Sequence, residues 1–147
     1  MNVDLEKMQR FLEQAEVLYL STSLNDVVSA RPISPLALGN RLFVRTSAAS
    51  RKAQEMLANP HVAGCVGNFY FTGTAKALGR AGAEENKDLK AAYQARYPGS
   101  FSEEDDFIQS DEVFFELLLE NVAEWVYENG VPVALAQQEL SGDAACY

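Results

Sequence analysis

The chain has 147 residues and a mass of 16.2 kDa, a length typical of one domain. Its formal net charge of −9 argues against nonspecific attraction to nucleic acid or to an anionic membrane. Two cysteines and one histidine are too few for a disulfide framework or a usual zinc site, so we expect no metal centre. No apolar run of about 18 residues occurs and the start of the chain does not read as a signal peptide, so the sequence predicts a cytoplasmic protein.

Hydrophobic periodicity and turn residues predict many short strands interrupted by helices. In chain order, the predicted elements are a helix over 4–16, strands over 17–24, 27–31 and 41–46, a helix over 51–58, strands over 61–66 and 69–78, helices over 84–97 and 102–109, and strands over 112–120 and 122–128. Asn25 and Asp26 supply the turn of a hairpin. Pro32 and Pro35 lack donors for a sheet ladder, so their segment should lie at a sheet edge or a bulge.

This order of elements favours a mainly β fold with flanking helices, in the form of a small closed or split barrel. Closure removes the exposed strand edges that would otherwise promote aggregation. We expect residues 1–147 to form a single domain, and the small and polar residues after about 130 to be loosely held.

The positive charges are concentrated in one part of an otherwise acidic chain. No acidic residue occurs between Val27 and Gln54. The same stretch contains five cations, namely Arg31, Arg41, Arg45, Arg51 and Lys52. Two interpretations remain open: a solvated surface of strand and helix, or a pocket for a small anion.

The start of the helix over 51–58 has the composition of a phosphate site. A helix N-terminus presents unpaired backbone N–H groups and partial positive charge. Ser50 is predicted as the N-cap, Arg51 supplies a planar fork of donors, and Lys52 supplies a point charge. Thr46 and Ser47 add hydroxyl groups just upstream. These residue types predict a phosphate monoester as the bound group.

The order of several short motifs resembles the pyridoxamine 5′-phosphate oxidase-like, FMN-binding split-barrel family. The motifs are Ala-Arg-Pro-Ile-Ser-Pro-Leu at 30–36, Leu-Phe-Val-Arg-Thr-Ser at 42–47, Ser-Arg-Lys at 50–52 and Asn-Pro-His-Val at 59–62. The resemblance extends over roughly residues 17–130. It implies a homodimer of antiparallel, Greek-key-type split barrels with FMN in a groove between the subunits.

The resemblance also implies roles for individual residues. Ser50, Arg51 and Lys52 would bind the FMN phosphate. The residues that would line the flavin are Arg31, Pro32, Ile33, Arg45 and Thr46. Thr74 stands where the family often places a glutamine against the ring, and either Trp125 or Tyr127 would reach the partner subunit's flavin.

The resemblance leads to three hypotheses for the function. The C-terminal part lacks the basic and histidine-containing segment with which the true oxidase holds its substrate, so we expect a different small molecule. The first hypothesis is an FMN-dependent oxidoreductase that uses a nicotinamide donor or oxygen; its catalytic residues are unknown, because a flavin needs little beyond binding and orientation. The alternatives are a non-catalytic flavin- or haem-binding protein for storage, sensing or stress response, and an interaction protein without cofactor. A haem-ligand role for His61 stays open, and Cys65 is expected to be packed and inert.

Overall fold

The computed structural model describes residues 1–101 and 111–140 as an antiparallel β-sheet with helices around it. The helices are α1 (Leu5–Gln14), α2 (Arg51–Ala58), the single turn η1 (Glu84–Asn86) and α3 (Lys87–Arg96). The strands are β1 (Leu18–Leu24), β2 (Val27–Ile33), β3 (Leu36–Leu38), β4 (Arg41–Ser47), β5 (His61–Val66), β6 (Phe69–Arg80), β7 (Glu112–Glu128) and β8 (Val131–Glu139). In these two ranges no helix has the length and apolar character needed to cross a membrane.

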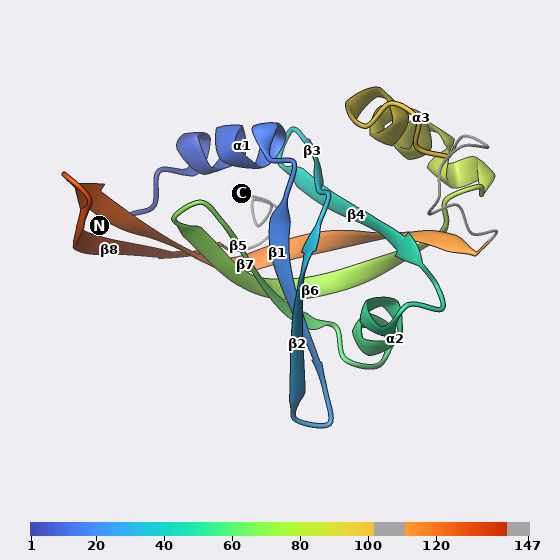
Figure 1. The fold of residues 1–147 in the computed structure, drawn as a ribbon, viewed down its shortest axis with the longest axis horizontal. Helices are drawn as coiled ribbons and strands as arrows, with labels where there is room; N and C mark the ends of the chain where they lie inside the picture. The colour runs from blue at the N-terminus through green and yellow to red at the C-terminus, as the bar shows by residue number, and fades with distance from the viewer. Residues whose placement is uncertain (102–110, 141–147) are drawn as a thin grey trace.

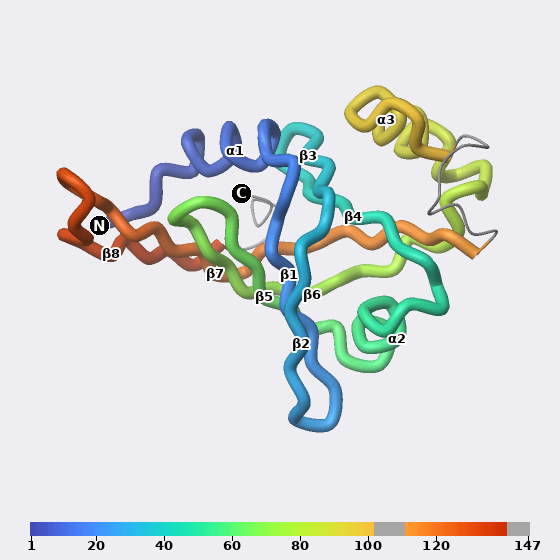
Figure 2. Tube along the Cα trace, in the orientation of Figure 1, coloured from blue at the N-terminus to red at the C-terminus, as the bar shows by residue number. Residues whose placement is uncertain are grey.

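The sheet curls back on itself. Its strand order is β2-β1-β5-β6-β7-β4-β3, every pairing is antiparallel, and β8 adds to β7 outside this path. The two ends of the path, β2 and β3, are separated in the chain by only Ser34 and Pro35. The edges of the sheet therefore come together at this connection, as the trace also shows (Figure 2). The predicted split-barrel class, mainly antiparallel β with flanking helices, is confirmed.

Local turn chemistry determines where the β1–β2 hairpin bends. Asn25 and Asp26 both have positive φ, at 53° and 65°, which is the backbone of a type I′ turn and one that Asn and Asp tolerate well. The predicted hairpin is confirmed, and it projects from the rest of the sheet with α2 beside it (Figure 1). Pro32 lies in β2, at one end of the strand order, so its predicted edge position is also confirmed.

Two hydrophobic clusters hold the molecule together. The larger one fills the inside of the barrel and includes Met8 and Leu12 from α1 and Ala53 and Met56 from α2. The smaller one lies against α3 and contains Leu36, Phe43, Ala81, Tyr93 and Phe114. Because α2 contributes two side chains that are at most 2% exposed to the main core, its position relative to the sheet is fixed by packing.

The last strands differ from the prediction. Instead of two strands over 112–120 and 122–128 there is one long strand, β7, which pairs first with β4 and then with β8. A register shift opposite Thr72 and Gly73 interrupts the alternation of side chains, which made one strand read as two.

The expectation of a loosely held tail after residue 130 is wrong for residues 131–139, which form β8 along β7. The missed signal is the pair Asn129-Gly130, whose φ values of 52° and 79° make another tight hairpin turn. The remainder of the expected tail, from residue 141 onward, and the predicted helix over 102–109 lie outside the described residues.

Candidate functional site

Helix α2 follows β4 after a loop of three residues, and its capped N-terminus forms one side of the candidate site. The Ser50 hydroxyl accepts a hydrogen bond from the Ala53 backbone N–H at 3.2 Å, so the predicted N-cap is confirmed. The Thr46 hydroxyl lies 2.8 Å from the Ser50 hydroxyl and links β4 to the helix start. Among the described residues, no acceptor contacts the backbone N–H groups of Arg51 and Lys52. These two donors are available to an anion.

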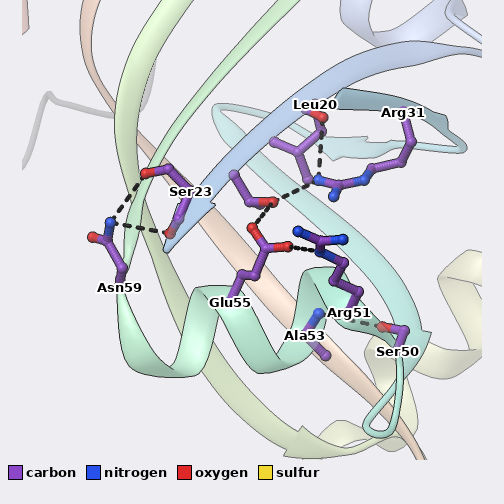
Figure 3. Close-up of polar contacts among 9 residues, drawn as sticks. Leu20, Ser23, Arg31, Ser50, Arg51, Ala53, Glu55 and Asn59 are labelled. Carbon is purple, nitrogen blue, oxygen red and sulfur yellow. Dashed lines mark hydrogen bonds and ion pairs between the residues drawn. The ribbon is translucent and has the colours of Figure 1, made fainter. Parts of the chain in front are cut away.

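A buried carboxylate lies at the centre of the polar contacts beside this helix start. Glu55 is 3% exposed and accepts hydrogen bonds from Arg51 Nε at 2.7 Å and from the Thr22 hydroxyl at 3.1 Å. The Thr22 oxygen in turn accepts a hydrogen bond from Arg31 Nη1 at 2.7 Å. Figure 3 shows this chain of contacts running from α2 to β2 through β1. The hydrogen bond from Arg51, more than any other contact, lowers the pKa of Glu55, so its carboxylate is charged at neutral pH.

Two further cations face the same region. Arg31 lies in β2 on the side of the strand that carries the buried Ile33, and burial lowers its pKa. Lys52 is half-buried, and its pKa is lowered first by burial and then by the charge of Arg31. In the described part of the chain, no carboxylate pairs with the Lys52 ammonium. We name Thr22, Arg31, Ser50, Arg51, Lys52 and Glu55 the α2 site.

The α2 site has a positive charge that suits a dianion. The site contains three cations, Arg31, Arg51 and Lys52, and one carboxylate, Glu55, which leaves two net positive charges. The proximity of like charges raises the free energy of the ligand-free site, and a bound anion would offset that repulsion. A phosphate monoester carries a charge of about −1.5 to −2 at neutral pH.

Arg45 is not part of this site, although the sequence analysis placed it beside the flavin. Its guanidinium lies 3.3 Å from a Glu112 carboxylate oxygen and is close to the rings of Tyr93 and Phe101, at 5.2 and 4.8 Å. Successive side chains of a strand point to opposite faces, so Arg45 faces α3 while Thr46 contacts Ser50.

Other predicted site residues near α2 have mainly structural contacts. The Ser47 hydroxyl donates to the Asp111 carboxylate at 3.2 Å and accepts from the Ala49 N–H, so it builds the loop before the helix. Ile33 belongs to the main core, and the exposed Pro32 points to the other face of β2. Of these three residues, Pro32 is exposed, Ser47 is partly exposed and Ile33 is buried.

The other residues predicted to contact the flavin, Thr74, Trp125 and Tyr127, do not contact the α2 site of their own chain. Thr74 is paired across the sheet with His61 of β5, rather than with a residue of the site. Trp125 and Tyr127 are exposed, at 41% and 53%, in the part of β7 that pairs with β8. That end of the molecule lies on the opposite side from α2 in Figure 1.

The two residues with open roles in the sequence analysis are both exposed. His61 is the first residue of β5 and its side chain is solvent-accessible. Cys65 was expected to be packed, but it is exposed as well. The buried positions of β5 are Val62, Gly64 and Val66, and Cys65 falls on the alternate face. Within residues 1–101 and 111–140, no three His, Cys, Asp or Glu side chains are grouped to hold a metal ion.

Thr22 and Glu55 were not predicted as site residues from the sequence. Glu55 follows Arg51 by four residues, the spacing of a helical ion pair, and it stands next to the buried Met56 on the core side of α2. A glutamate on the apolar side of a helix is a signal that could have been used. Thr22 had no such signal, because its contact with Glu55 spans 33 residues.

A shallow groove of about 330 Å³ lies beside the α2 site. Thr22 and Ser23 of β1 belong to its lining, together with Val28 of β2 and His61 of β5. Thr22 thus belongs both to the lining of the groove and to the α2 site.

The described fold and site define a class of protein: an antiparallel split barrel with a cationic helix start. The sequence model of the pyridoxamine 5′-phosphate oxidase family matches residues 5–126, and the chain belongs to this family. The resemblance noted in the sequence is thus confirmed. No curated protein matches the chain.

Solved structures share the fold at low sequence identity. An FAD-binding protein from Mesorhizobium loti is 21% identical, with a TM-score of 0.58 over 82% of this chain and 91% of that one. An F420 reductase is 17% identical, with a TM-score of 0.62 over 78% and 94% of the two chains. A heme binding protein from Mycobacterium smegmatis is 14% identical, with a TM-score of 0.69 over 95% of this chain and 59% of that one.

Proposed function

We propose that this protein binds FMN and acts as an oxidoreductase on a small molecule, with a nicotinamide donor or oxygen as the second reactant. The observation that carries the proposal is the charge of the α2 site, where Lys52 is half-buried beside Arg31. A phosphate dianion would balance the two net charges and accept from the free N–H groups of the helix start. Membership of the pyridoxamine 5′-phosphate oxidase family supports a phosphorylated cofactor.

The groove beside Thr22 is the proposed position of the flavin ring. It is shallow and open to solvent, so one chain would leave much of a three-ring system uncovered. A second copy of the chain would cover the ring, as expected for a homodimer with the cofactor between subunits. In that arrangement Trp125 or Tyr127 would contact the partner subunit's flavin, because the β7–β8 hairpin that carries them lies on the opposite side of the molecule from α2 (Figure 1).

The protein's proposed contribution to the chemistry is binding, orientation and charge. A bound flavin would itself supply the hydride and electron transfer. Arg31, Arg51 and Lys52 would hold the phosphate, and the positive field of the site would favour electron-rich states of a nearby ring. Two of the similar structures, the FAD-binding protein and the F420 reductase, support a flavin-type cofactor.

A non-catalytic cofactor-binding protein is the second candidate. The likeness to the heme binding protein, with a TM-score of 0.69, favours haem as the alternative group. The sole histidine of the chain, His61, is exposed and borders the same groove. It is the residue that would bind the haem iron in this candidate.

The visible spectrum of the purified protein distinguishes these candidates. We expect a flavin spectrum and release of FMN into the supernatant after denaturation. Bleaching by NADH or NADPH would support the oxidoreductase, and a stable flavin spectrum would support a storage or sensing role. A Soret band in place of the flavin bands would contradict the FMN proposal and support haem.

The double variant Arg51→Ala with Lys52→Ala tests the position of the phosphate. Each charge-assisted hydrogen bond contributes about 1.5–3 kcal/mol. The loss of both side chains should therefore weaken the affinity for FMN at least about 100-fold. Arg51 is exposed and Lys52 only half-buried, and the helix packs on the core through Ala53 and Met56, so circular dichroism and thermal melting should show a folded protein. Unchanged FMN affinity in a fluorescence titration would refute the proposed site.

A further inference from the structure

Glu55 places a negative charge inside a site that we propose to bind an anion. Charge alone would make this unfavourable, because the carboxylate reduces the net attraction for a phosphate. Yet both carboxylate oxygens are engaged with residues of the site, Oε1 with Arg51 Nε and Oε2 with the Thr22 hydroxyl. We therefore expect Glu55 to have a role other than attracting the phosphate.

The geometry of the contacts determines how the two guanidinium groups are presented. Glu55 binds Arg51 through Nε, and in the described part of the chain no other residue contacts the two Nη groups of Arg51. The Arg51 side chain is 69% exposed, so without this contact it would sample many rotamers. Figure 3 shows its guanidinium on the same side of α2 as Glu55, facing Arg31.

The Arg31 guanidinium is held by Glu55 indirectly, in a relay through the Thr22 hydroxyl. The Thr22 hydroxyl has one proton, which it donates to Glu55, so its oxygen is left to accept from Arg31 Nη1 at 2.7 Å. The Leu20 carbonyl oxygen accepts from the same nitrogen at 3.4 Å. The Nε and Nη2 groups of Arg31 are not used in either contact.

We propose that Glu55 is a positioning residue of the α2 site: it holds Arg51 directly and Arg31 through Thr22, so that both guanidinium groups are oriented for one phosphate before it binds. This inference rests on the proposed function. Ordering the two arginines in advance reduces the conformational entropy lost on binding, and that gain exceeds the attraction lost to one negative charge.

Helix α2 has other anchors, so Glu55 is not required to hold it in place. The Asn59 side-chain amide donates to the Ser23 carbonyl oxygen and to the Ser23 hydroxyl, both at 3.1 Å, and fixes the end of the helix against β1. Ala53 and Met56 are buried in the main core. A variant at Glu55 is therefore expected to fold with α2 in its place.

The test compares FMN with riboflavin, which lacks the phosphate, in titrations of the wild type and of Glu55→Gln. Wild type should bind FMN much more tightly than riboflavin. A glutamine is neutral and has one acceptor oxygen, so it loses the charge-assisted hydrogen bond and cannot accept from both Arg51 and Thr22. We expect FMN binding to weaken at least about tenfold, although the site gains positive charge, while riboflavin affinity stays the same.

A second variant tests the relay alone. Thr22→Val keeps the Glu55 carboxylate and the ion pair with Arg51 but removes the hydroxyl that connects to Arg31. We expect a smaller, several-fold loss that is again confined to FMN. If Glu55→Gln does not fold, this variant decides the matter: wild-type FMN affinity in Thr22→Val would overturn the relay from Glu55 to Arg31.

Glu116→Gln is the matched control. Glu116 is also a buried carboxylate paired with an arginine, Arg41, at 2.9 and 2.8 Å, but it lies in β7 opposite Phe43, on the other face of the sheet from Thr46 and Ser50. Its FMN-to-riboflavin affinity ratio should equal that of wild type.

The other outcomes are also decisive. An unchanged or tighter FMN affinity in Glu55→Gln, or an equal loss for riboflavin, would overturn the positioning role. A wild type that binds FMN and riboflavin equally would instead refute the phosphate site itself, which separates the failure of the proposed function from the failure of this inference.

Discussion

Lys52 is the residue whose protonation should control ligand binding. Burial and the charge of Arg31 both disfavour its charged form, so its pKa lies below the 10.5 usual for lysine. In the ligand-free protein the charged ammonium therefore reduces stability, and this cost disappears as the pH rises through the lowered pKa. A bound phosphate acts in the opposite direction, because it stabilises the charged form.

Binding of FMN should therefore have two pH limits. Affinity should rise through the second ionisation of the phosphate, at about pH 6, and fall again when Lys52 loses its proton at a pH below 10.5. Titrations across this range measure both limits. In Lys52→Arg the guanidinium stays protonated to above about pH 12, so the alkaline fall should be reduced. An identical alkaline fall in both proteins would show that another group is responsible.

At the scale of elements, helix α2 supplies three charged residues of the α2 site, Arg51, Lys52 and Glu55. One end is tied to β4 by Thr46 and Ser50, and the other end is tied to β1 by Asn59 and Ser23. The helix also adjoins the projecting β1–β2 hairpin that supplies Thr22 and Arg31 (Figure 1). The position of the cations thus depends on how one helix is capped and packed.

Ser50→Ala should lower both stability and binding. Loss of an N-cap hydroxyl costs about 1 kcal/mol, which corresponds to a fall in Tm of about 3–5 °C for a protein of this size. Thermal melting followed by circular dichroism measures the change, and FMN affinity should fall in the same variant because the hydroxyl belongs to the site. Ser34→Ala is the control, since Ser34 is exposed. Equal melting temperatures in the two variants would contradict the capping role.

At the scale of the whole molecule, one outer face of the sheet is unusually apolar. Tyr19, Cys65 and Tyr70 are cross-strand neighbours on β1, β5 and β6, and all three are exposed. Contiguous exposed aromatic and apolar groups are typical of protein interfaces. This face adjoins the groove beside Thr22, where we propose that a second copy covers the flavin.

Substitutions on this face should separate the proposed dimer. We expect wild type to sediment as a dimer at micromolar concentration, and Tyr19→Glu with Tyr70→Glu to shift it toward monomer, because buried charges without partners are unfavourable. FMN affinity should fall together with dimerisation. Leu38→Glu introduces a charge at another exposed apolar position and should leave the dimer intact. A monomeric wild type, or a double variant that remains dimeric, would contradict the shared groove.

Features that depend on neighbouring residues could be predicted from the sequence. The hairpin turn at Asn25 and Asp26 follows from their tolerance of positive φ, and the N-cap at Ser50 follows from its place before a helical pattern. The same reasoning would have found the turn at Asn129-Gly130, and with it β8, had that pair been weighed. The concentration of five cations between residues 27 and 54 was likewise apparent from composition.

The side of the sheet on which a residue lies could not be read in the same way. Arg45 and Thr46 are adjacent in sequence, yet one faces the α3 cluster and the other faces α2. Both faces of β4 are covered, so the burial pattern of this strand does not alternate and gives no indication of direction. The prediction that Cys65 is packed was wrong for a related reason: its apolar neighbours in β5 suggested that both faces of the strand are buried, but Cys65 is exposed.

By itself, the sequence determined the barrel class, the capped helix and the presence of a cationic segment, because propensity, turn chemistry and formal charge act over a few residues. Only the tertiary structure decided which of those cations share a site. The pairing of β1 with β2 and the packing of α2 against β1 bring Arg31, Thr22 and Glu55 together from three separate elements. Electrostatic interactions depend on distance in space, and for these residues that distance is set by the fold of the whole chain.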